Sequence, residues 1–367
     1  YGFDNIGDES ILRTLVSSLR EHIPNCSLTV LSHNPTSTRE KYGVEAVDRM
    51  SPMAILRAVK KCDMLISGGG SLLQDVTSSK SLHYYLSIIR CAEFFHKKVF
   101  IYSQGIGPID RPGNRRAAAA ALKRADGIVV RDERSASLLE EIGIARDKVV
   151  ITADPVIRMK KPDGDVGAEI LRKAGVSLDG RLTVGWAIRE RDTDSRFVKE
   201  LLRSIQMMKD KYNAQSVLIP FHYEEDGEVC RHIAAQLPDD TAVCLNEKYL
   251  SEDMLSIIGN MDLLVGVRLH SLIYAAIMGV PLIGISYDPK CTAFLNSVGL
   301  DKLSTKENFT AEIFLPEAER VLETGKEQVE CVESHMAKLS RKLDTNEKMI
   351  CAIMEKSRKH TMQDPQN

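Results

Sequence analysis

The pattern of apolar and polar residues alternates between short apolar runs and longer stretches with helical spacing. Continuous apolar runs indicate strands buried on both faces, as in a parallel sheet, and the stretches between them indicate amphipathic helices. In the first half the predicted strands are 28–32, 44–47, 64–67, 99–102, 128–130 and 149–152. The predicted helices between them are 51–61, 81–97, 112–125 and 133–142. This alternation is typical of a doubly wound parallel sheet.

The alternation restarts after the polar, turn-forming segment 160–165, which we interpret as an interdomain linker. The strands predicted beyond it are 182–187, 217–220, 242–245, 263–267 and 282–286, with helices at 195–211, 225–236, 251–259 and between the last two strands. From Thr310 onward the pattern is helical. Because 367 residues exceed one ordinary core, we predict two α/β domains, 1–160 and 161–367, the second with a helical C-terminal segment.

The chain opens with a loop, residues 1–9, that is rich in Gly, Asn and Asp. The loop runs into an amphipathic helix whose inner face carries apolar residues at 11, 12, 15, 16 and 19. In a sheet of this kind such a loop follows a strand. We therefore expect a first strand ahead of Tyr1.

Composition and charge exclude several classes of protein. The 49 basic and 51 acidic residues give no electrostatic basis for binding nucleic acid. The eight cysteines are scattered without metal-ligand spacing, which favours a reducing cytoplasm and implies no metal site. Charged residues and a proline interrupt the most apolar window, so we expect no transmembrane helix. The basic tail, 338–359, is either a solvated helix face or, alternatively, a surface that touches an acidic membrane.

Two predicted strands of the first domain end in glycine-rich loops. One runs into three glycines, 68–70, and the other into Gln-Gly-Ile-Gly-Pro, 104–108. Glycines let a ligand approach the backbone closely, and polar side chains beside them can hydrogen-bond sugar hydroxyls. Neither loop has the spacing of a dinucleotide fingerprint or a P-loop, and for each the alternative is a tight turn without a ligand. With the N-terminal loop, they predict a polar-ligand site whose residues are Asp8, Gly69, Gly70, Asp75 and Gln104.

Arginine side chains follow three further predicted strands, at Arg131, Arg189 and Arg268. Guanidinium groups grip phosphate and carboxylate in a bidentate manner. After Arg268 come Leu269, His270 and Ser271, at the start of a predicted helix, where unpaired N–H groups attract an anion. The alternative is that these side chains form surface salt bridges or cap helices. Their shared position at the carboxyl ends of strands favours a ligand site, and Lys290 borders the same edge.

Five motifs together resemble the polysaccharide pyruvyl transferase family, most closely its bacterial branch that modifies secondary cell wall polymers for surface-layer anchoring. They are Gly-Phe-Asp-Asn-Ile-Gly-Asp-Glu (2–9), Ser-Gly-Gly-Gly-Ser-Leu-Leu-Gln-Asp (67–75), Gln-Gly-Ile-Gly-Pro (104–108), Val-Arg-Asp-Glu-Arg-Ser (130–135) and Gly-Val-Arg-Leu-His-Ser (266–271). The resemblance implies a GT-B-like fold, two Rossmann-like domains facing a cleft. It also implies transfer of the enolpyruvyl group of phosphoenolpyruvate onto a sugar, with release of phosphate.

For the cell wall branch, the resemblance implies a terminal N-acetylmannosamine of a lipid-linked disaccharide as acceptor and a 4,6-ketal as product. Phosphoenolpyruvate is then a substrate, and no cofactor or metal is required. The protein would work in the cytoplasm, where contact with the inner face of the cell membrane is a further option.

The residues can be assigned to the steps of this chemistry. The donor carries a carboxylate and a phosphate, which call for more than one guanidinium. Family experience singles out the Arg-Leu-His triplet, and His270 is our candidate general acid. The predicted catalytic residues are His270, Arg268 and Arg131, and the predicted donor-binding residues are Arg189, Ser271 and Lys290. The first domain would bind the acceptor through the polar-ligand residues named above, with Asp8 and Asp75 as alternative bases.

Two other functions stay open at this point. A nucleotide-sugar glycosyltransferase could share the same two-domain build, since fold does not dictate function. A non-catalytic glycan-binding protein could use the glycine-lined site instead. The low aromatic content, 5% with a single Trp, disfavours this second alternative because sugar-binding modules rely on stacking rings.

Overall fold

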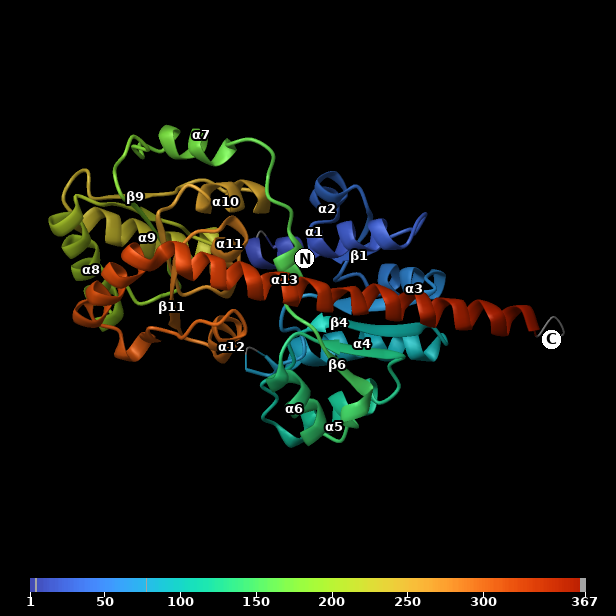
Figure 1. Ribbon diagram of the computed structural model, residues 1–367. Coiled ribbons are helices and arrows are strands. Elements are labelled where there is room, and N and C mark those ends of the chain that lie inside the picture. Colours follow the sequence, from blue (N-terminus) through green and yellow to red (C-terminus); the bar gives the residue numbers. More distant parts are fainter. Residues whose placement is uncertain (4, 77, 364–367) are drawn as a thin grey trace. The chain divides into compact units, whose positions relative to one another are not determined.

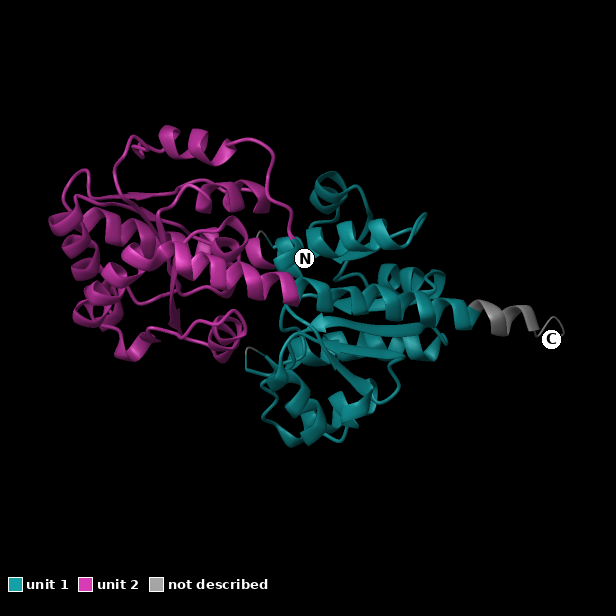
Figure 2. Cartoon of the chain, viewed as in Figure 1, with its two compact units in different colours: residues 1–3, 8–158, 339–367 teal, residues 4–7, 159–338 magenta. Residues whose placement is uncertain are grey.

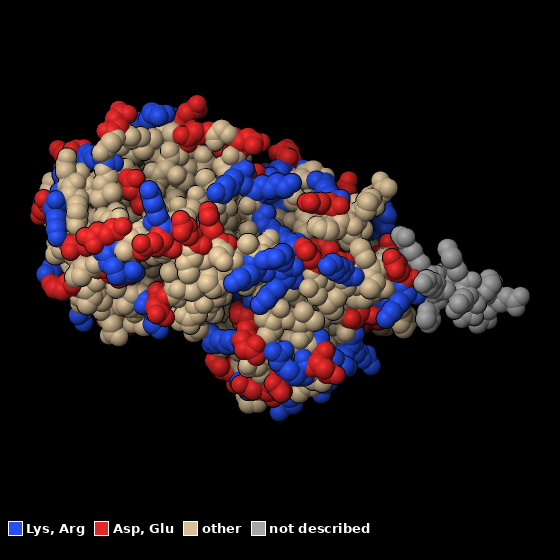
Figure 3. All heavy atoms as spheres, in the orientation of Figure 1, with Lys and Arg blue, Asp and Glu red and all other residues tan. Residues whose placement is uncertain are grey.

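The computed structural model describes residues 1–3, 5–76 and 78–363, with side chains as far as Ser357. The chain forms two compact units, shown in Figure 2. Unit 1 consists of Tyr1–Phe3, Asp8–Arg158 and Leu339–Asn367, and unit 2 of Asp4–Gly7 and Met159–Lys338. On the face shown in Figure 3, basic and acidic side chains are interspersed, as the net charge of −2 leads one to expect.

Unit 1 is built on parallel strands. A four-stranded sheet has the order β3-β4-β5-β6, and β1 and β2 form a separate pair. The strands are β1 Thr29–Ser32, β2 Glu45–Asp48, β3 Met64–Gly68, β4 Lys98–Gln104, β5 Gly127–Val130 and β6 Val149–Ile151. The helices are α1 Ile6–His22, α2 Pro35–Tyr42, α3 Pro52–Lys61, α4 Ser79–Phe94, α5 Pro112–Leu122 and α6 Glu133–Glu141. All six predicted strands are confirmed.

Unit 2 has one six-stranded parallel sheet of order β12-β11-β10-β7-β8-β9. Its strands are β7 Thr183–Ala187, β8 Gln215–Leu218, β9 Ala242–Cys244, β10 Leu263–Gly266, β11 Leu282–Ser286 and β12 Ser304–Thr305. Its helices are α7 Val166–Lys173, α8 Arg196–Tyr212, α9 Tyr223–Gln236, α10 Ser251–Ile258, α11 Leu269–Met278 and α12 Pro289–Ser297, followed by α13 Ala311–Gln363. The chain fills one side of β7 first and then the other, so the strand order switches between β7 and β10.

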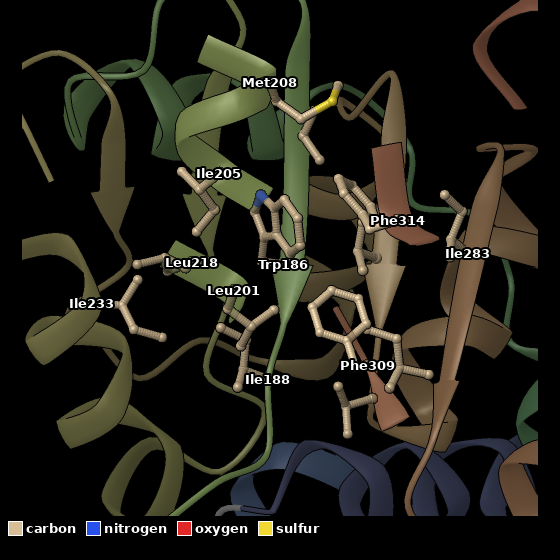
Figure 4. Packing of buried hydrophobic residues seen from close by; sticks show 14 of the residues in the cluster. Trp186, Ile188, Leu201, Ile205, Met208, Leu218, Ile233, Ile283, Phe309 and Phe314 are labelled. Atoms are coloured by element: carbon tan, nitrogen blue, oxygen red, sulfur yellow. The ribbon is translucent and has the colours of Figure 1, made fainter. Parts of the chain in front are cut away.

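The core of unit 2 surrounds Trp186 on β7, which is fully buried (Figure 4). Its ring lies 5.1 Å from that of Phe314, at the start of α13, and its indole N–H donates to Ser216 Oγ at 3.0 Å. The indole therefore buries a large apolar surface without leaving its polar atom unpaired. The Trp186–Ser216 hydrogen bond also joins the neighbouring strands β7 and β8.

The long helix α13, red in Figure 1, contributes to both units. The helical pattern of the tail assigns it to the second predicted domain, but residues from Leu339 onward group with unit 1. Ile350 joins a buried cluster with Leu15 and Phe100, and Asn346 donates to Ser103 Oγ at 2.8 Å. Burial of these side chains draws this part of the helix onto unit 1. No helix in the described part of the chain has both the length and the apolar character needed to cross a bilayer.

Glu347 makes the main polar contacts between this part of α13 and the rest of unit 1. Its loss is expected to lower the free energy of unfolding. Its carboxylate is 1% exposed, accepts hydrogen bonds from Ser18 (2.7 Å) and Tyr102, and lies 3.5 Å from Arg158. Removing one partner of a buried charged network costs about 3–5 kcal/mol. Glu347→Ala should therefore lower the midpoint of thermal unfolding by several degrees, whereas the exposed Glu330→Ala on the same helix should not. Equal midpoints for the two variants would contradict this expectation.

Candidate active site

Polar and charged side chains gather at the carboxyl edge of the unit 2 sheet. Because its strands are parallel, the residues that follow β7, β8, β10 and β11 lie at one edge. Open α/β sheets bind ligands at this edge, where the strand order switches, which here is between β7 and β10. The side chains contributed are Arg189 after β7, His222, Glu225 and Asp226 at the start of α9, Arg268 and His270 after β10, and Tyr287 after β11.

Arg268 is the N-cap residue of α11, and its guanidinium forms a hydrogen-bonded ion pair with Asp226. The Arg268 side chain is 12% exposed and that of Asp226 1%, and a second carboxylate, Glu225, lies 3.8 Å from the same Nη2. Asp226 also accepts from the backbone N–H of His222 at 2.9 Å. Among the described residues, no group hydrogen-bonds to the buried Nε of Arg268. The ion pair with Asp226 thus orients the Arg268 guanidinium, and its Nε–H can still donate to a ligand.

His270 lies in the first turn of α11, packed against the start of α1 at Gly7. A Cβ atom placed on Gly7 would lie 2.1 Å from His270 Nδ1 and 2.6 Å from Cε1. This part of the chain is held by an antiparallel bridge between Asn5 and His222 and by the Ile6 N–H, which donates to Phe221 O at 3.3 Å. The N-terminal motif therefore requires glycine at position 7, because any larger residue would overlap the His270 imidazole.

Adding one methyl group at Gly7 should impair catalysis by displacing the imidazole. A misplacement of about 1 Å at a reacting group costs on the order of 10²-fold in rate. If His270 is the general acid expected from the sequence, Gly7→Ala should lower kcat about 100-fold in an assay of phosphate release from phosphoenolpyruvate, the expected donor. Gly113→Ala is the matched control, since no atom lies within 4 Å of its added Cβ. A Gly7→Ala variant with the kcat of the control would show that the close approach has no catalytic importance.

Arg189 is held by Tyr287, to whose hydroxyl it donates and over whose ring its Cζ lies 4.7 Å from the centroid. Burial alone would lower the pKa of Arg189, but Tyr287 and the carboxylates Glu225 and Asp226 outweigh it and raise that pKa. Burial raises the pKa of Glu225, yet His222 and nearby arginines, Arg268 and Arg189 among them, bring that pKa below its usual value. The two shifts favour the charged forms of Arg189 and Glu225 together.

Ser271 and Lys290, the other predicted donor-binding residues, also lie at this edge. The Ser271 hydroxyl donates to the backbone carbonyl of Arg268 at 2.7 Å and is fully buried. Lys290 Nζ lies 3.3 Å from Asp288 Oδ2, and its backbone N–H is capped by the same carboxylate at 3.0 Å. Ser271 thus stiffens the turn after β10, while Lys290 presents a partly exposed cation beside α12.

Arg131 belongs to unit 1, and its guanidinium is engaged there. It donates to Asp154 Oδ2 at 2.8 Å and to Ser71 Oγ at 3.0 Å, and its side chain is 6% exposed. A Cβ on Gly105 would lie 2.7 Å from Nη2, so this glycine is required for the guanidinium to fit. These hydrogen bonds tie Arg131, which follows β5, to residues that follow β3 and β6. The predicted catalytic role of Arg131 stays a prediction.

The predicted acceptor residues of unit 1 divide into two groups. Gly69 and Gly70 have positive φ angles, +98° and +46°, and a Cβ on Gly70 would lie 3.3 Å from Asp8 Oδ1. Gln104 is fully buried and reaches the Gly69 carbonyl at 3.4 Å. These four residues therefore share one loop region at the end of β3. The glycines supply the backbone turn that places Asp8 beside it.

The Asp75 carboxylate is hydrogen-bonded to residues at the start of α5. Its carboxylate accepts from the backbone N–H groups of Asp110 (2.9 Å) and Arg111 (3.1 Å) and from the Asn114 amide (2.8 Å). Burial acts to raise the pKa of Asp75, but these hydrogen bonds outweigh it and hold that pKa below its usual value. A carboxylate occupied in this way is a poor proton acceptor, which disfavours Asp75 as the base.

An aromatic cluster in unit 1 escaped the sequence analysis because its members are far apart in the chain. Phe3 stacks on His33 with ring centroids 4.5 Å apart, and Arg49 lies over the rings of Phe3, Tyr84 and Tyr85 at 5.2, 4.8 and 5.6 Å. His33 and Arg49 directly follow β1 and β2. The cluster thus provides stacking faces and a cation at the carboxyl ends of these strands, a combination suited to a sugar or an anion.

Comparison with solved structures identifies the fold. HepE from Anabaena in complex with UDP-glucose aligns with a TM-score of 0.63 and 11% identity, covering 95% of this chain and 96% of that one. The UDP-GlcNAc 2-epimerase from Neisseria meningitidis bound to UDP-GlcNAc aligns with a TM-score of 0.59 and 14% identity, covering 95% and 96%. At such identities the likeness concerns the fold alone. The fold is α/β and GT-B-like, as the sequence analysis predicted.

Comparison of sequences identifies the family. The amylovoran biosynthesis protein AmsJ of Erwinia amylovora is 21% identical in an alignment of 263 residues that covers 67% of this chain. The match spans 62% of AmsJ, less than two thirds of that relative's length. The family description for polysaccharide pyruvyl transferases matches residues 5–289, which is most of the chain. This chain therefore belongs to the polysaccharide pyruvyl transferase family.

Proposed function

We propose that the protein transfers the enolpyruvyl group of phosphoenolpyruvate onto a sugar, forming a 4,6-ketal and releasing phosphate. The observation that carries the proposal is the grouping of Arg189, Arg268 and His270 at the switch point of the unit 2 sheet. Two guanidinium groups match a donor that carries both a carboxylate and a phosphate. An imidazole at the start of α11 adds a group that can deliver a proton near neutral pH.

The carboxylates at this edge prepare the arginines for an anionic donor. Asp226 holds Arg268, and together with Glu225 it raises the pKa of Arg189. Each guanidinium is thus oriented before the donor arrives, which reduces the cost of ordering it on binding. When the donor binds, its phosphate would compete with these carboxylates for the remaining N–H groups. Stabilisation by such fixed donors is greatest where negative charge grows on the departing phosphate.

The chemistry then proceeds in three steps. His270 delivers a proton to the methylene carbon of phosphoenolpyruvate, and C2 becomes electrophilic. One sugar hydroxyl adds to C2 and loses its proton to a base, for which Asp8 of unit 1 is our candidate. The C2–O bond to phosphate breaks, phosphate leaves with the bonding electron pair, and the second hydroxyl closes the ketal with loss of its proton.

We assign recognition of the acceptor to unit 1, through Asp8, Gly69, Gly70 and Gln104, with the aromatic cluster at Arg49 as a further contact surface. The motifs resemble the cell wall branch of the family, so the acceptor we propose is a terminal N-acetylmannosamine on a lipid-linked disaccharide. Such an acceptor places the enzyme in the cytoplasm at the inner face of the membrane. The product would then serve the anchoring of surface-layer proteins.

Incubation with phosphoenolpyruvate and a panel of lipid-linked disaccharides tests this proposal. Mass spectrometry should show an acceptor that gains one pyruvyl ketal, and an equal amount of phosphate should be released. Parallel reactions with UDP-sugars test the rival function, nucleotide-sugar transfer, which rests on the fold alone. Sugar transfer from a UDP-sugar without any reaction of phosphoenolpyruvate would overturn the proposal, and binding of the glycan without turnover of either donor would favour a glycan-binding role.

A further inference from the structure

Large apolar side chains are exposed on unit 1 in an uneven way. Six of them occur within its first 94 residues, namely Phe3, Met50, Met53, Leu56, Val76 and Phe94. Three of the six lie close together in the chain: Met50 (68% exposed) just before α3, and Met53 (57%) and Leu56 (38%) in its first turns. Single exposed apolar residues are ordinary, but a contiguous group marks a surface that something covers.

The orientation of α3 places these side chains beside basic ones. Val59 is buried and Ile55 packs on the core of unit 1, so the opposite side of the helix faces outward. Met53, Leu56, Arg57, Lys60 and Lys61 are all exposed and recur at the three- and four-residue spacing of one helical face. No residue of α3 is acidic. We call Met50, Met53, Leu56, Arg57, Lys60 and Lys61 the α3 face.

We propose that the α3 face docks on an anionic phospholipid bilayer. Its apolar side chains would enter the boundary between headgroups and acyl chains, and its three cations would lie against lipid phosphates. Charge complementarity decides the occupant, because three cations without an acidic residue on the helix match a uniformly anionic surface. The proposal rests on the proposed function in one respect, since a lipid-linked acceptor gives the enzyme a reason to visit the membrane.

The position of the α3 face in unit 1 supports this occupant. The apolar end of α3 follows β2 and so lies at the carboxyl end of the β1–β2 pair. Tyr1 links that end to the glycine loop, since its carbonyl accepts from His33 N–H (2.9 Å) and its hydroxyl donates to Gly68 O (2.8 Å). The apolar residues are therefore on the same edge of unit 1 as the predicted acceptor loop. A bilayer held there would present a lipid-linked sugar to that loop.

The basic tail, residues 338–359, is the other candidate for a membrane-binding surface, and it is less suited to that role. Leu343, Asn346, Glu347 and Ile350 are buried against unit 1. The neighbouring lysines and arginines alternate with acidic side chains such as Asp344, which pairs with Arg158. The α3 face lacks such acidic neighbours within its own helix.

Co-sedimentation of the full chain with vesicles tests the proposal. Vesicles of phosphatidylglycerol and phosphatidylcholine should bind the wild type, and vesicles of phosphatidylcholine alone should bind it much more weakly. Met50→Ser/Met53→Ser and Arg57→Glu/Lys60→Glu should each reduce binding to the anionic vesicles at least about tenfold. The matched controls Val166→Ser/Ile313→Ser and Arg116→Glu/Lys123→Glu replace exposed residues elsewhere and should bind as the wild type does.

Three outcomes would overturn the proposal. The first is unchanged vesicle binding in both α3 variants, and the second is equal loss in the controls. The third is dissociation of a dimer by Met50→Ser/Met53→Ser with vesicle binding intact, which would make the α3 face an interface between copies of this chain. Failure of the proposed function is recognised separately, because vesicle binding needs no phosphoenolpyruvate. Transfer to a soluble disaccharide analogue should be the same in the α3 variants as in the wild type.

Discussion

Replacement of His270 by alanine is expected to abolish pyruvyl transfer, with a fall in kcat of about 10²–10⁴-fold, the range typical for loss of a general acid. The imidazole begins α11 at the switch edge of the unit 2 sheet and is packed against Gly7. In the proposed mechanism His270 delivers the proton that makes C2 of the donor electrophilic, so its removal takes away the assigned general acid. Phosphate release from phosphoenolpyruvate, measured at saturating acceptor, reports the loss directly.

The pH dependence separates an acid from a residue that only holds the site in shape. In the wild type, loss of the proton from the acid should lower kcat as pH rises, and this limb should be absent from the residual activity of His270→Ala. His232→Ala is the matched control, because this histidine lies near the end of α9, where it hydrogen-bonds Gln236. Thermal unfolding should be similar in the two variants. Wild-type turnover in His270→Ala would remove the imidazole from the mechanism.

The elements that the sequence predicted are those whose stability comes from a buried apolar run. The strands of both sheets belong to this class, and so does α8, whose inner face carries Val198, Leu201 and Ile205. The helices that were not predicted, α2, α7 and α12, are only eight or nine residues long. Asn34, Asp165 and Asp288 each accept a backbone N–H as N-cap residue. A short capped helix has too few buried positions to show a period.

The sequence placed the cations of the candidate site at strand ends but gave no sign of the side chains that hold them. Arg189, Arg268 and His270 could be found because each directly follows an apolar strand, and strand ends are where parallel sheets bind ligands. Asp226 and Tyr287 escaped because they come from α9 and the loop after β11, and no local pattern connects them to the arginines they hold. Such pairings depend on the order of strands in the sheet, which a single sequence does not reveal.

The same reasoning explains why the sequence does not reveal where the tail docks. Its helical pattern was clear, but the residue that docks it, Glu347, bonds to Ser18 across 329 positions of the chain and to Tyr102 across 245. A buried glutamate within a helix looks like any solvated charge in the sequence. Only the three-dimensional contacts show that this part of α13 belongs to unit 1.

Arg268→Lys is expected to lower kcat/KM for phosphoenolpyruvate by about 10²–10³-fold, the cost of losing one fixed donor to a developing anion. Lysine keeps the positive charge but has no planar fork, so it cannot hold Asp226 and a donor anion at once. Asp226 would then bind the ammonium as a simple ion pair, and the donor would lose its oriented N–H groups. Initial rates at varied phosphoenolpyruvate measure the change, with a rise in KM as well as a fall in kcat. Arg203→Lys, which alters an exposed arginine paired with Glu200 and Glu312, is the control.

A purely structural role for Arg268 makes a different prediction. If the guanidinium served only to neutralise Asp226, whose side chain is 1% exposed, lysine would still satisfy that charge in part. The folded variant would lose some stability and keep the kcat/KM of the wild type. If Arg268 binds the donor, Arg268→Lys should instead lower kcat/KM even at temperatures well below its unfolding midpoint, where the variant is fully folded. Because Asp226→Asn leaves the fork in place but removes its counter-charge, it should weaken stability more than Arg268→Lys does while impairing donor binding less.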